Sequence, residues 1–138
     1  VITTPQDVAS HVAVKAVSMF EKLNVPILGV VENMSHFICP NCDDKHYIFG
    51  EGGGLKISEQ FKIPFLGEIP LNSGIMAGSD LGKPIMISSV DSPSAEAFRI
   101  SAKNIAAQCS IQAAKLQEEM AAEPAEETAE TPESTTQN

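Results

Sequence analysis

Two short runs of branched apolar residues constrain the fold of this chain more than any other feature. The run 26–31 does not alternate between apolar and polar residues, and the run 63–69 has a similar character. A strand of this kind is covered on both faces, as strands in parallel α/β sheets are. A helical pattern precedes each run. A helix followed by a buried strand, repeated along the chain, predicts a doubly wound α/β fold with a mostly parallel sheet.

The first helix is expected to begin at Thr4-Pro5 and to end near Asn24. Thr4 can cap the helix and Pro5 suits its first position. The helix ends there because Pro26 restricts the residue before it. At helical spacing, the expected buried stripe consists of Val8, Val12, Ala16, Met19, Phe20 and Leu23.

Further helices are expected in the second half of the chain. A short helix over 54–61 follows a glycine-rich lead, and a last helix opens at Ser92-Pro93. The segment 72–84 contains several glycines among polar residues, so we interpret it as a loop with about one helical turn. Cys109 falls on the apolar stripe of the last helix, where we expect it to behave as a small apolar residue.

Charge is unevenly distributed along the 138 residues. The formal net charge of the chain is −9 at pH 7, but seven acidic residues and no basic residue follow position 117. The preceding part contains eleven acidic and nine basic residues and is therefore close to neutral. We expect one domain over 1–117 and a disordered acidic tail over 118–138, because the tail cannot bury enough apolar surface to offset its chain entropy.

Composition also argues against several classes of function. The domain has no basic patch for nucleic acid, and no apolar run is long enough to cross a bilayer. Three cysteines, two of them in a C-x-x-C motif, favour a reducing compartment with metal or redox use over a disulfide framework. Because the chain begins at Val1 with what resembles the end of a strand, we interpret it as the C-terminal piece of a longer protein.

The C-x-x-C motif of Cys39 and Cys42 is the most specific chemical signal, since two thiolates at this spacing can reach one metal centre. A thioredoxin-type redox pair is disfavoured because two aspartates follow directly and would oppose a thiolate. A zinc knuckle is one alternative, with His36 and His46 completing a tetrahedral set. An iron–sulfur cluster is the other. Two copies of the chain, related by a two-fold axis, would supply the four thiolates that a four-iron cluster needs.

Motifs for nucleotide binding are weak in this chain. Asn33 ends the first apolar run, at the sheet edge where ligands of open α/β folds bind, although its amide could equally satisfy a turn. The segment 78–84 is one residue short of a P-loop and has Pro84 in place of the required Ser or Thr. The segment 50–54 lacks the third glycine of a dinucleotide fingerprint. Both glycine segments are interpreted as turns.

Several segments, in the same order, resemble one protein family. They are 3–9 (TTPQDVA), 25–35 (VPILGVVENMS), 37–42 (FICPNC), 48–54 (IFGEGGG), 64–71 (PFLGEIPL) and 82–85 (GKPI). Together they look like the C-terminal half of Mrp/ApbC-type iron–sulfur cluster carrier ATPases, a branch of the MinD-like P-loop NTPases. The resemblance covers about residues 1–108 and does not include the tail.

The resemblance implies a homodimer that holds a labile four-iron cluster through Cys39 and Cys42 of both subunits and transfers it to apo-proteins. It implies ATP and magnesium binding with slow hydrolysis in the longer protein, with Asn33 and the segment around Pro70 lining the nucleotide pocket. The phosphate-binding loop of the family lies upstream of Val1. No catalytic residue is therefore expected within this chain.

Two departures from the family pattern concern the nucleotide side. Asn72 stands where the family usually has Asp, and Met76 stands near a frequent Arg. The alternatives to a cluster carrier are a structural zinc-knuckle module and a MinD-like regulatory ATPase whose cysteines are incidental. A cytoplasmic location is implied, with the mitochondrial or plastid matrix as the alternative.

Overall fold

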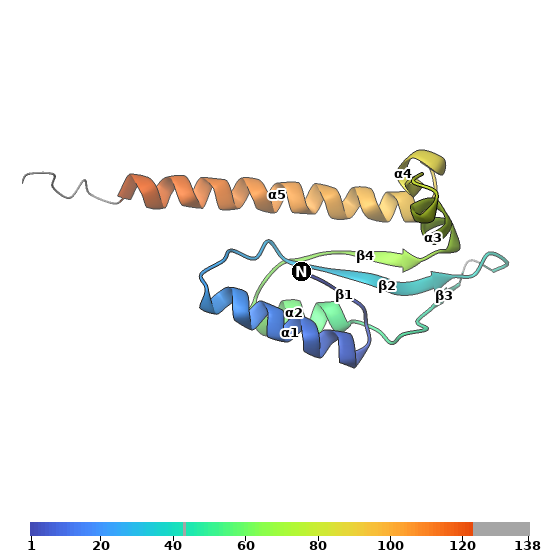
Figure 1. The fold of residues 1–138 in the computed structure, drawn as a ribbon, viewed down its shortest axis with the longest axis horizontal. Coiled ribbons are helices and arrows are strands. Elements are labelled where there is room, and N and C mark those ends of the chain that lie inside the picture. Colours follow the sequence, from blue (N-terminus) through green and yellow to red (C-terminus); the bar gives the residue numbers. More distant parts are fainter. Residues whose placement is uncertain (43, 123–138) are drawn as a thin grey trace, which may run out of the picture.

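The computed structural model describes residues 1–42 and 44–122. Within them a small mixed sheet lies between two layers of helices, with α1 and α2 on one face and α5 on the other (Figure 1). In chain order the elements are β1 (Ile2–Thr3), α1 (Asp7–Lys22), β2 (Val30–Ile38), β3 (Lys45–His46), α2 (Gly53–Phe61), β4 (Phe65–Leu71), α3 (Ser73–Asp80), α4 (Ile85–Ser88) and α5 (Pro93–Ala122). The predicted α/β class with helices on both faces is confirmed.

Strand β2 is the centre of the sheet. Its first part pairs in parallel with β1 and β4, and its last part pairs antiparallel with β3. Phe37 faces Leu71 of β4 on one side and His46 of β3 on the other, so β3 lies on the same edge of β2 as β1. The sheet is therefore mixed, and β2 and β3 form an antiparallel hairpin around the cysteines.

Two neighbouring valines explain why the first apolar run does not alternate. Val30 packs in a cluster with Ala13, Val17 and Ile57 under α1 and α2, whereas Val31 packs in a second cluster under α5. Successive residues of a strand point to opposite faces, so a sheet covered on both sides needs apolar residues at both positions. The expectation of a strand buried on both faces is confirmed.

Strand β2 begins later and runs further than the sequence indicated. The predicted strand covered 26–31, whereas β2 covers Val30–Ile38. The start is delayed because Gly29 has a φ of +148° and lies against Pro64, whose carbonyl oxygen would be only 2.3 Å from an added Cβ. Beyond Val31 the strand continues because β4 supplies a parallel partner, with an irregularity between Asn33 and Phe37 that absorbs extra residues.

Strand β4 covers Phe65–Leu71, so Pro70 lies inside it, although the predicted apolar run ended at residue 69. Pro70 falls between the Asn33–Ile69 and Phe37–Leu71 pairs, where the register of the two strands is irregular. Proline is tolerated at such positions because no ladder hydrogen bond is lost. The strand therefore continues to Leu71.

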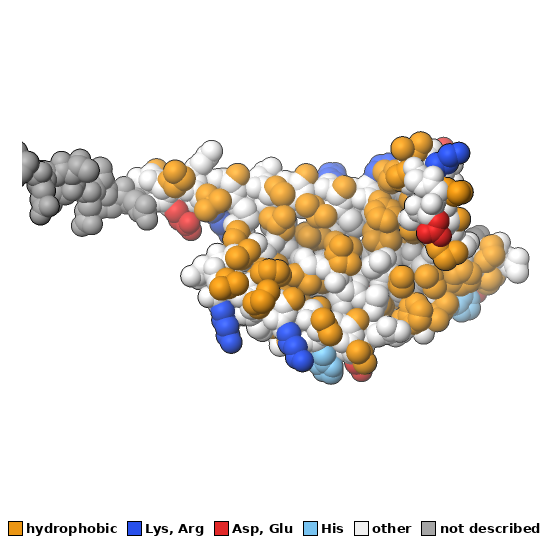
Figure 2. Space-filling model, in the orientation of Figure 1, with side chains coloured by type: hydrophobic (Ala, Val, Ile, Leu, Met, Phe, Trp, Pro, Cys, Tyr) orange, Lys and Arg blue, Asp and Glu red, His pale blue; other side chains and the backbone are white. Residues whose placement is uncertain are grey.

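The buried face of α1 differs from the predicted stripe. Ala13 and Val17 are the buried residues of this helix, while Val8 and Val12 are 79% and 64% exposed. Met19 and Leu23 are exposed as well, and apolar side chains are visible over this face in Figure 2. The prediction was wrong because apolar residues surround most of α1, so periodicity alone could not decide which side faces β2.

The segment predicted as a loop over 72–84 is more helical than expected. Helix α3 covers Ser73–Asp80, and the Asn72 side chain caps it by accepting a hydrogen bond from the Gly74 N–H at 2.6 Å. An asparagine at this position satisfies one of the unpaired amides of the first turn. Gly74 and Gly78, two of the glycines that suggested a loop, lie within α3, whereas Gly82 follows the helix with a φ of +65°.

Helix α5 begins at Pro93, as predicted, and the Ser92 hydroxyl accepts a hydrogen bond from the Ala95 N–H at 3.2 Å. The helix continues to Ala122, five residues beyond the predicted domain boundary at 117. Residues 118–122 of the predicted disordered tail are therefore helical, and 123–138 lie outside the described residues. Among the described helices, none combines the length and apolar character needed to span a bilayer.

Candidate metal centre

The two cysteines of the C-x-x-C motif lie in the tight connection between β2 and β3. Ile38 pairs with Lys45, and the Cys39 N–H donates to the Asp44 carbonyl oxygen at 3.0 Å. This hydrogen bond extends the hairpin ladder by one step into the turn. The hairpin projects from one end of the sheet (Figure 1), so its tip is positioned by the central strand of the fold.

Three potential metal ligands converge at this tip. The sulfur atoms of Cys39 and Cys42 and a ring nitrogen of His46 all lie within 4.8 Å of one another. Cys39 is half-buried, whereas Cys42 and His46 are exposed. Two sulfur atoms and an imidazole nitrogen form a donor set suited to a thiophilic metal ion, and the two sulfur atoms alone are ligands of the kind that iron–sulfur clusters take. The residues present therefore fit such a group, and the site is accessible from solvent.

His36 is not a member of this group, although the zinc alternative counted it as a ligand. Its side chain is buried, with Nδ1 at 2.8 Å from the Ser35 hydroxyl and 3.7 Å from a Glu68 carboxylate oxygen. Burial lowers the pKa of His36, Lys45 lowers it further, and Glu68 opposes both. The structure thus brings together three of the four proposed zinc ligands.

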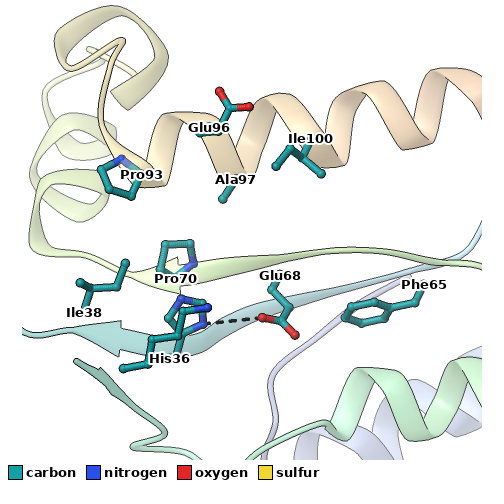
Figure 3. Close-up of a pocket in the computed structure, with 10 residues that line it drawn as sticks. His36, Ile38, Phe65, Glu68, Pro70, Pro93, Glu96, Ala97 and Ile100 are labelled. Atoms are coloured by element: carbon teal, nitrogen blue, oxygen red, sulfur yellow. Dashed lines mark ion pairs between the residues drawn. The ribbon is translucent and has the colours of Figure 1, made fainter. Parts of the chain in front are cut away.

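The surroundings of His36 form a cavity of about 490 Å³ between the sheet and the first turns of α5. Figure 3 shows His36 and Glu68 facing each other below Ala97 of α5. Ser35, His36 and Glu68 do not form a nucleophilic triad, because the serine and the carboxylate approach the same ring nitrogen. A triad needs a histidine that contacts its two partners through different nitrogens.

The two nucleotide-side candidates lie next to each other in the sheet but line different cavities. Asn33 pairs with Ile69, the residue before Pro70. Asn33 lines a cavity bounded by β1 and α1 and another below α5, whereas Pro70 lines two cavities nearer the hairpin. The Asn33 amide oxygen accepts a hydrogen bond from the Met34 N–H at 2.9 Å, so the amide satisfies the backbone here.

Met34 follows with a φ of +55°, which is unusual for a residue with a side chain. This left-handed residue lies where the register between β2 and β4 becomes irregular. The extra length of β2 is thereby accommodated just before the strand enters the hairpin. Sequence patterns gave no sign of it, since methionine does not favour this conformation.

Glu32 is a buried polar residue that the sequence analysis missed. Its side chain is 2% exposed and accepts a hydrogen bond from the Gly54 N–H at 2.6 Å, at the start of α2. Burial raises the pKa of Glu32. The hydrogen bond from Gly54 lowers this pKa, and the nearby Glu68 carboxylate raises it further. The contact joins β2 to the helix that follows the hairpin. The glycine-rich segment 50–54 was the available signal, because it allows the backbone to approach closely.

Cys109 is exposed on α5, contrary to the expectation that it packs as a small apolar residue. It lies outside the group of three ligands at the hairpin. Only the two cysteines of the C-x-x-C motif are therefore candidates for the metal centre among the described residues. Cys109 provides a natural control for experiments on them.

Comparison with known protein families identifies the family to which the chain belongs. A family model described as ParA, NUBPL iron-transfer P-loop NTPase, matches residues 1–106. The chain belongs to this family. The predicted resemblance to cluster carriers of the MinD-like P-loop NTPases is confirmed at the level of the family.

Individual relatives agree with the family assignment. The iron–sulfur cluster transfer protein NUBPL of Dictyostelium discoideum is 44% identical over 111 residues, which are 80% of this chain and 34% of the relative. A solved nucleotide-binding protein of Archaeoglobus fulgidus, in complex with ADP and with cobalt found in it, is 40% identical with a TM-score of 0.53. That likeness covers 66% of this chain and 36% of the other.

The cell division ATPase MinD of Pyrococcus furiosus shares the fold, with a TM-score of 0.55 at 23% identity over 75% of this chain and 39% of the other. The chain therefore spans 34% to 39% of the length of these three proteins.

Proposed function

We propose that this chain carries the cluster-binding segment of an iron–sulfur cluster carrier. The single observation behind the proposal is the convergence of Cys39 and Cys42 at an exposed hairpin, in a chain that belongs to an iron-transfer family. The cluster is cargo here rather than a resident cofactor. An exposed site favours this role, because a cluster that is to be handed on must be reachable by the recipient.

Two thiolates are too few to hold a four-iron cluster, which takes about four. We propose that Cys39 and Cys42 of two copies share one cluster across a two-fold axis. The hairpin supports this arrangement because it projects beyond the end of the sheet (Figure 1), where a second copy could reach its tip. The partners proposed are therefore a second copy of the chain and apo-proteins that accept the cluster.

Transfer by this site needs only ligand exchange. A thiol of the recipient loses its proton and binds an iron atom, and the iron–sulfur bond to Cys39 or Cys42 breaks. The displaced thiolate takes up a proton, so charge balances and no oxidant or reductant is needed. Repeated at each iron, the exchange moves the cluster to the recipient. The exposure of Cys42 suits it to be displaced first.

Nucleotide binding and hydrolysis are proposed for the longer protein of this family rather than for these residues alone. The Archaeoglobus fulgidus relative, which was solved with ADP, supports a nucleotide site in the complete fold. We propose that Asn33 and the segment around Pro70 form the part of that site contributed by this chain. ATP and magnesium would then regulate loading or release of the cluster.

The test of the cluster assignment is anaerobic reconstitution with iron and sulfide. Cys39→Ala and Cys42→Ala are expected to lose iron and acid-labile sulfide during gel filtration, because each removes two of the four thiolates of the dimer. Cys109→Ala is the matched control, since it removes an exposed thiol away from the hairpin. Normal cluster retention in either hairpin variant would refute the assignment.

A further inference from the structure

The hairpin offers three ligands from a single chain, and a cluster shared between two copies does not use all of them. Two cysteines from each copy already provide four thiolates, so His46 is left over. Yet the His46 ring nitrogen lies within 4.8 Å of both sulfur atoms. Its backbone is held there by the β3 pairing with Phe37. An imidazole fixed beside two thiolates requires an explanation of its own.

The size of the group indicates a single ion. Around a tetrahedral zinc ion, with bonds of about 2.3 Å to sulfur and 2.0 Å to nitrogen, ligand atoms are about 3.5–3.8 Å apart. The three atoms here are no more than 4.8 Å apart, so changes of at most about 1.3 Å in these separations close the cage. Thiolates that bind different irons of a cluster are further apart than thiolates that share one ion. The compact group therefore fits one ion better than one edge of a cluster.

The donor types also select the ion. Two thiolates and an imidazole favour zinc or ferrous iron over magnesium and calcium, which prefer oxygen ligands. No second histidine completes the set within the described residues, because His36 is buried and engaged with Ser35 and Glu68. One coordination position is therefore left open to solvent. Sites with three protein ligands and an open position are a familiar arrangement for zinc.

We propose that Cys39, Cys42 and His46 of one chain bind a single divalent ion of the thiophilic class, which includes zinc and ferrous iron. Ion binding needs one chain, whereas cluster binding needs two. The same thiolates serve both states, so an ion-loaded chain cannot load a cluster. This exclusion rests on the proposed cluster function, but ion binding itself does not. His46 thereby distinguishes an ion-loaded monomer from a cluster-loaded dimer.

The test is an anaerobic titration of the reduced full chain with Co²⁺, which reports thiolate ligation and tetrahedral geometry through its visible absorption. The wild type is expected to bind one ion per chain and to remain monomeric in sedimentation. His46→Ala is expected to weaken binding by at least about tenfold, because loss of a direct ligand exceeds the usual effect of losing a supporting contact. His11→Ala, which changes an exposed histidine on α1, is the matched control.

Two results would overturn the inference. One is binding by His46→Ala that equals binding by His11→Ala, and the other is a stoichiometry of one ion per two chains. Circular dichroism of each variant verifies that the fold is retained.

Cluster reconstitution separates this inference from the proposed function. His46→Ala is expected to load a cluster as the wild type does, and saturating Zn²⁺ is expected to prevent loading in the wild type. Loss of the cluster from His46→Ala, or loading despite saturating Zn²⁺, contradicts the division of roles.

Discussion

Glu32 gives the most detailed stability prediction, because it is a buried carboxylate with one defined partner. Glu32→Ala removes the acceptor of the Gly54 N–H, which is bonded at 2.6 Å, and leaves that donor unsatisfied at the start of α2. A hydrogen bond to a charged group contributes about 1.5–3 kcal/mol, so we expect a loss of about 2 kcal/mol or more. Glu32→Gln keeps an acceptor and is expected to cost less than about 1 kcal/mol at pH 7.

The pH dependence of these variants provides a sharper test. Burial raises the pKa of Glu32 above its ordinary value of 4.5, so the folded state holds the proton more tightly than the unfolded state does. The wild type is then most favoured below pH 4.5 and loses this contribution as pH rises through the raised pKa. Glutamine does not titrate, so the stability of Glu32→Gln relative to wild type should improve as pH increases across that range.

Urea unfolding of both proteins at several pH values measures this difference. Glu59→Gln, an exposed position on α2, is the matched control and should follow the wild type. A Glu32→Gln difference that is constant with pH, or that worsens as pH rises, would refute the assignment of a buried carboxylate with a raised pKa.

The remaining predictions concern the ends of two elements. Gly29→Ala should destabilise the fold by at least about 2 kcal/mol. The position has a φ of +148°, and an added Cβ would lie only 2.3 Å from the Pro64 carbonyl oxygen. A denaturant midpoint equal to that of the wild type would contradict this prediction. Asn72→Ala should cost about 1 kcal/mol through loss of the α3 cap at Gly74, whereas Asn72→Asp should cost little, and thermal unfolding compares the two. Equal melting temperatures for the two Asn72 variants would show that the cap does not stabilise the helix.

The sequence was sufficient where one physical requirement determined the pattern. Val30 and Val31 must both be apolar because helices cover both faces of the sheet, and this predicted the fold class. The start of α5 was predicted because serine is a favoured N-cap and proline suits the first position of a helix. The proximity of Cys39 and Cys42 was predicted because two thiolates in a C-x-x-C motif can reach one metal centre. In each case local and tertiary preferences agree.

The sequence was insufficient where tertiary contacts made the choice. Periodicity could not select the buried face of α1, since Val12 and Ala13 are both apolar and only one faces β2. It also could not separate His36 from His46 as a ligand. Both are close to the cysteines in the sequence, but strand alternation and pairing with β3 place only His46 beside the sulfur atoms. Burial of Glu32 depends on an approach by α2 from more than twenty residues away.

The central claim is that two copies of the hairpin enclose one cluster. The most direct measurement is the iron and sulfide content of the anaerobically reconstituted protein together with its mass in solution. The account predicts about four irons and four sulfides per two chains, in a species with the mass of a dimer that reverts to monomer when the cluster is removed. Colourless monomeric protein after reconstitution, or a full cluster on each single chain, would contradict it.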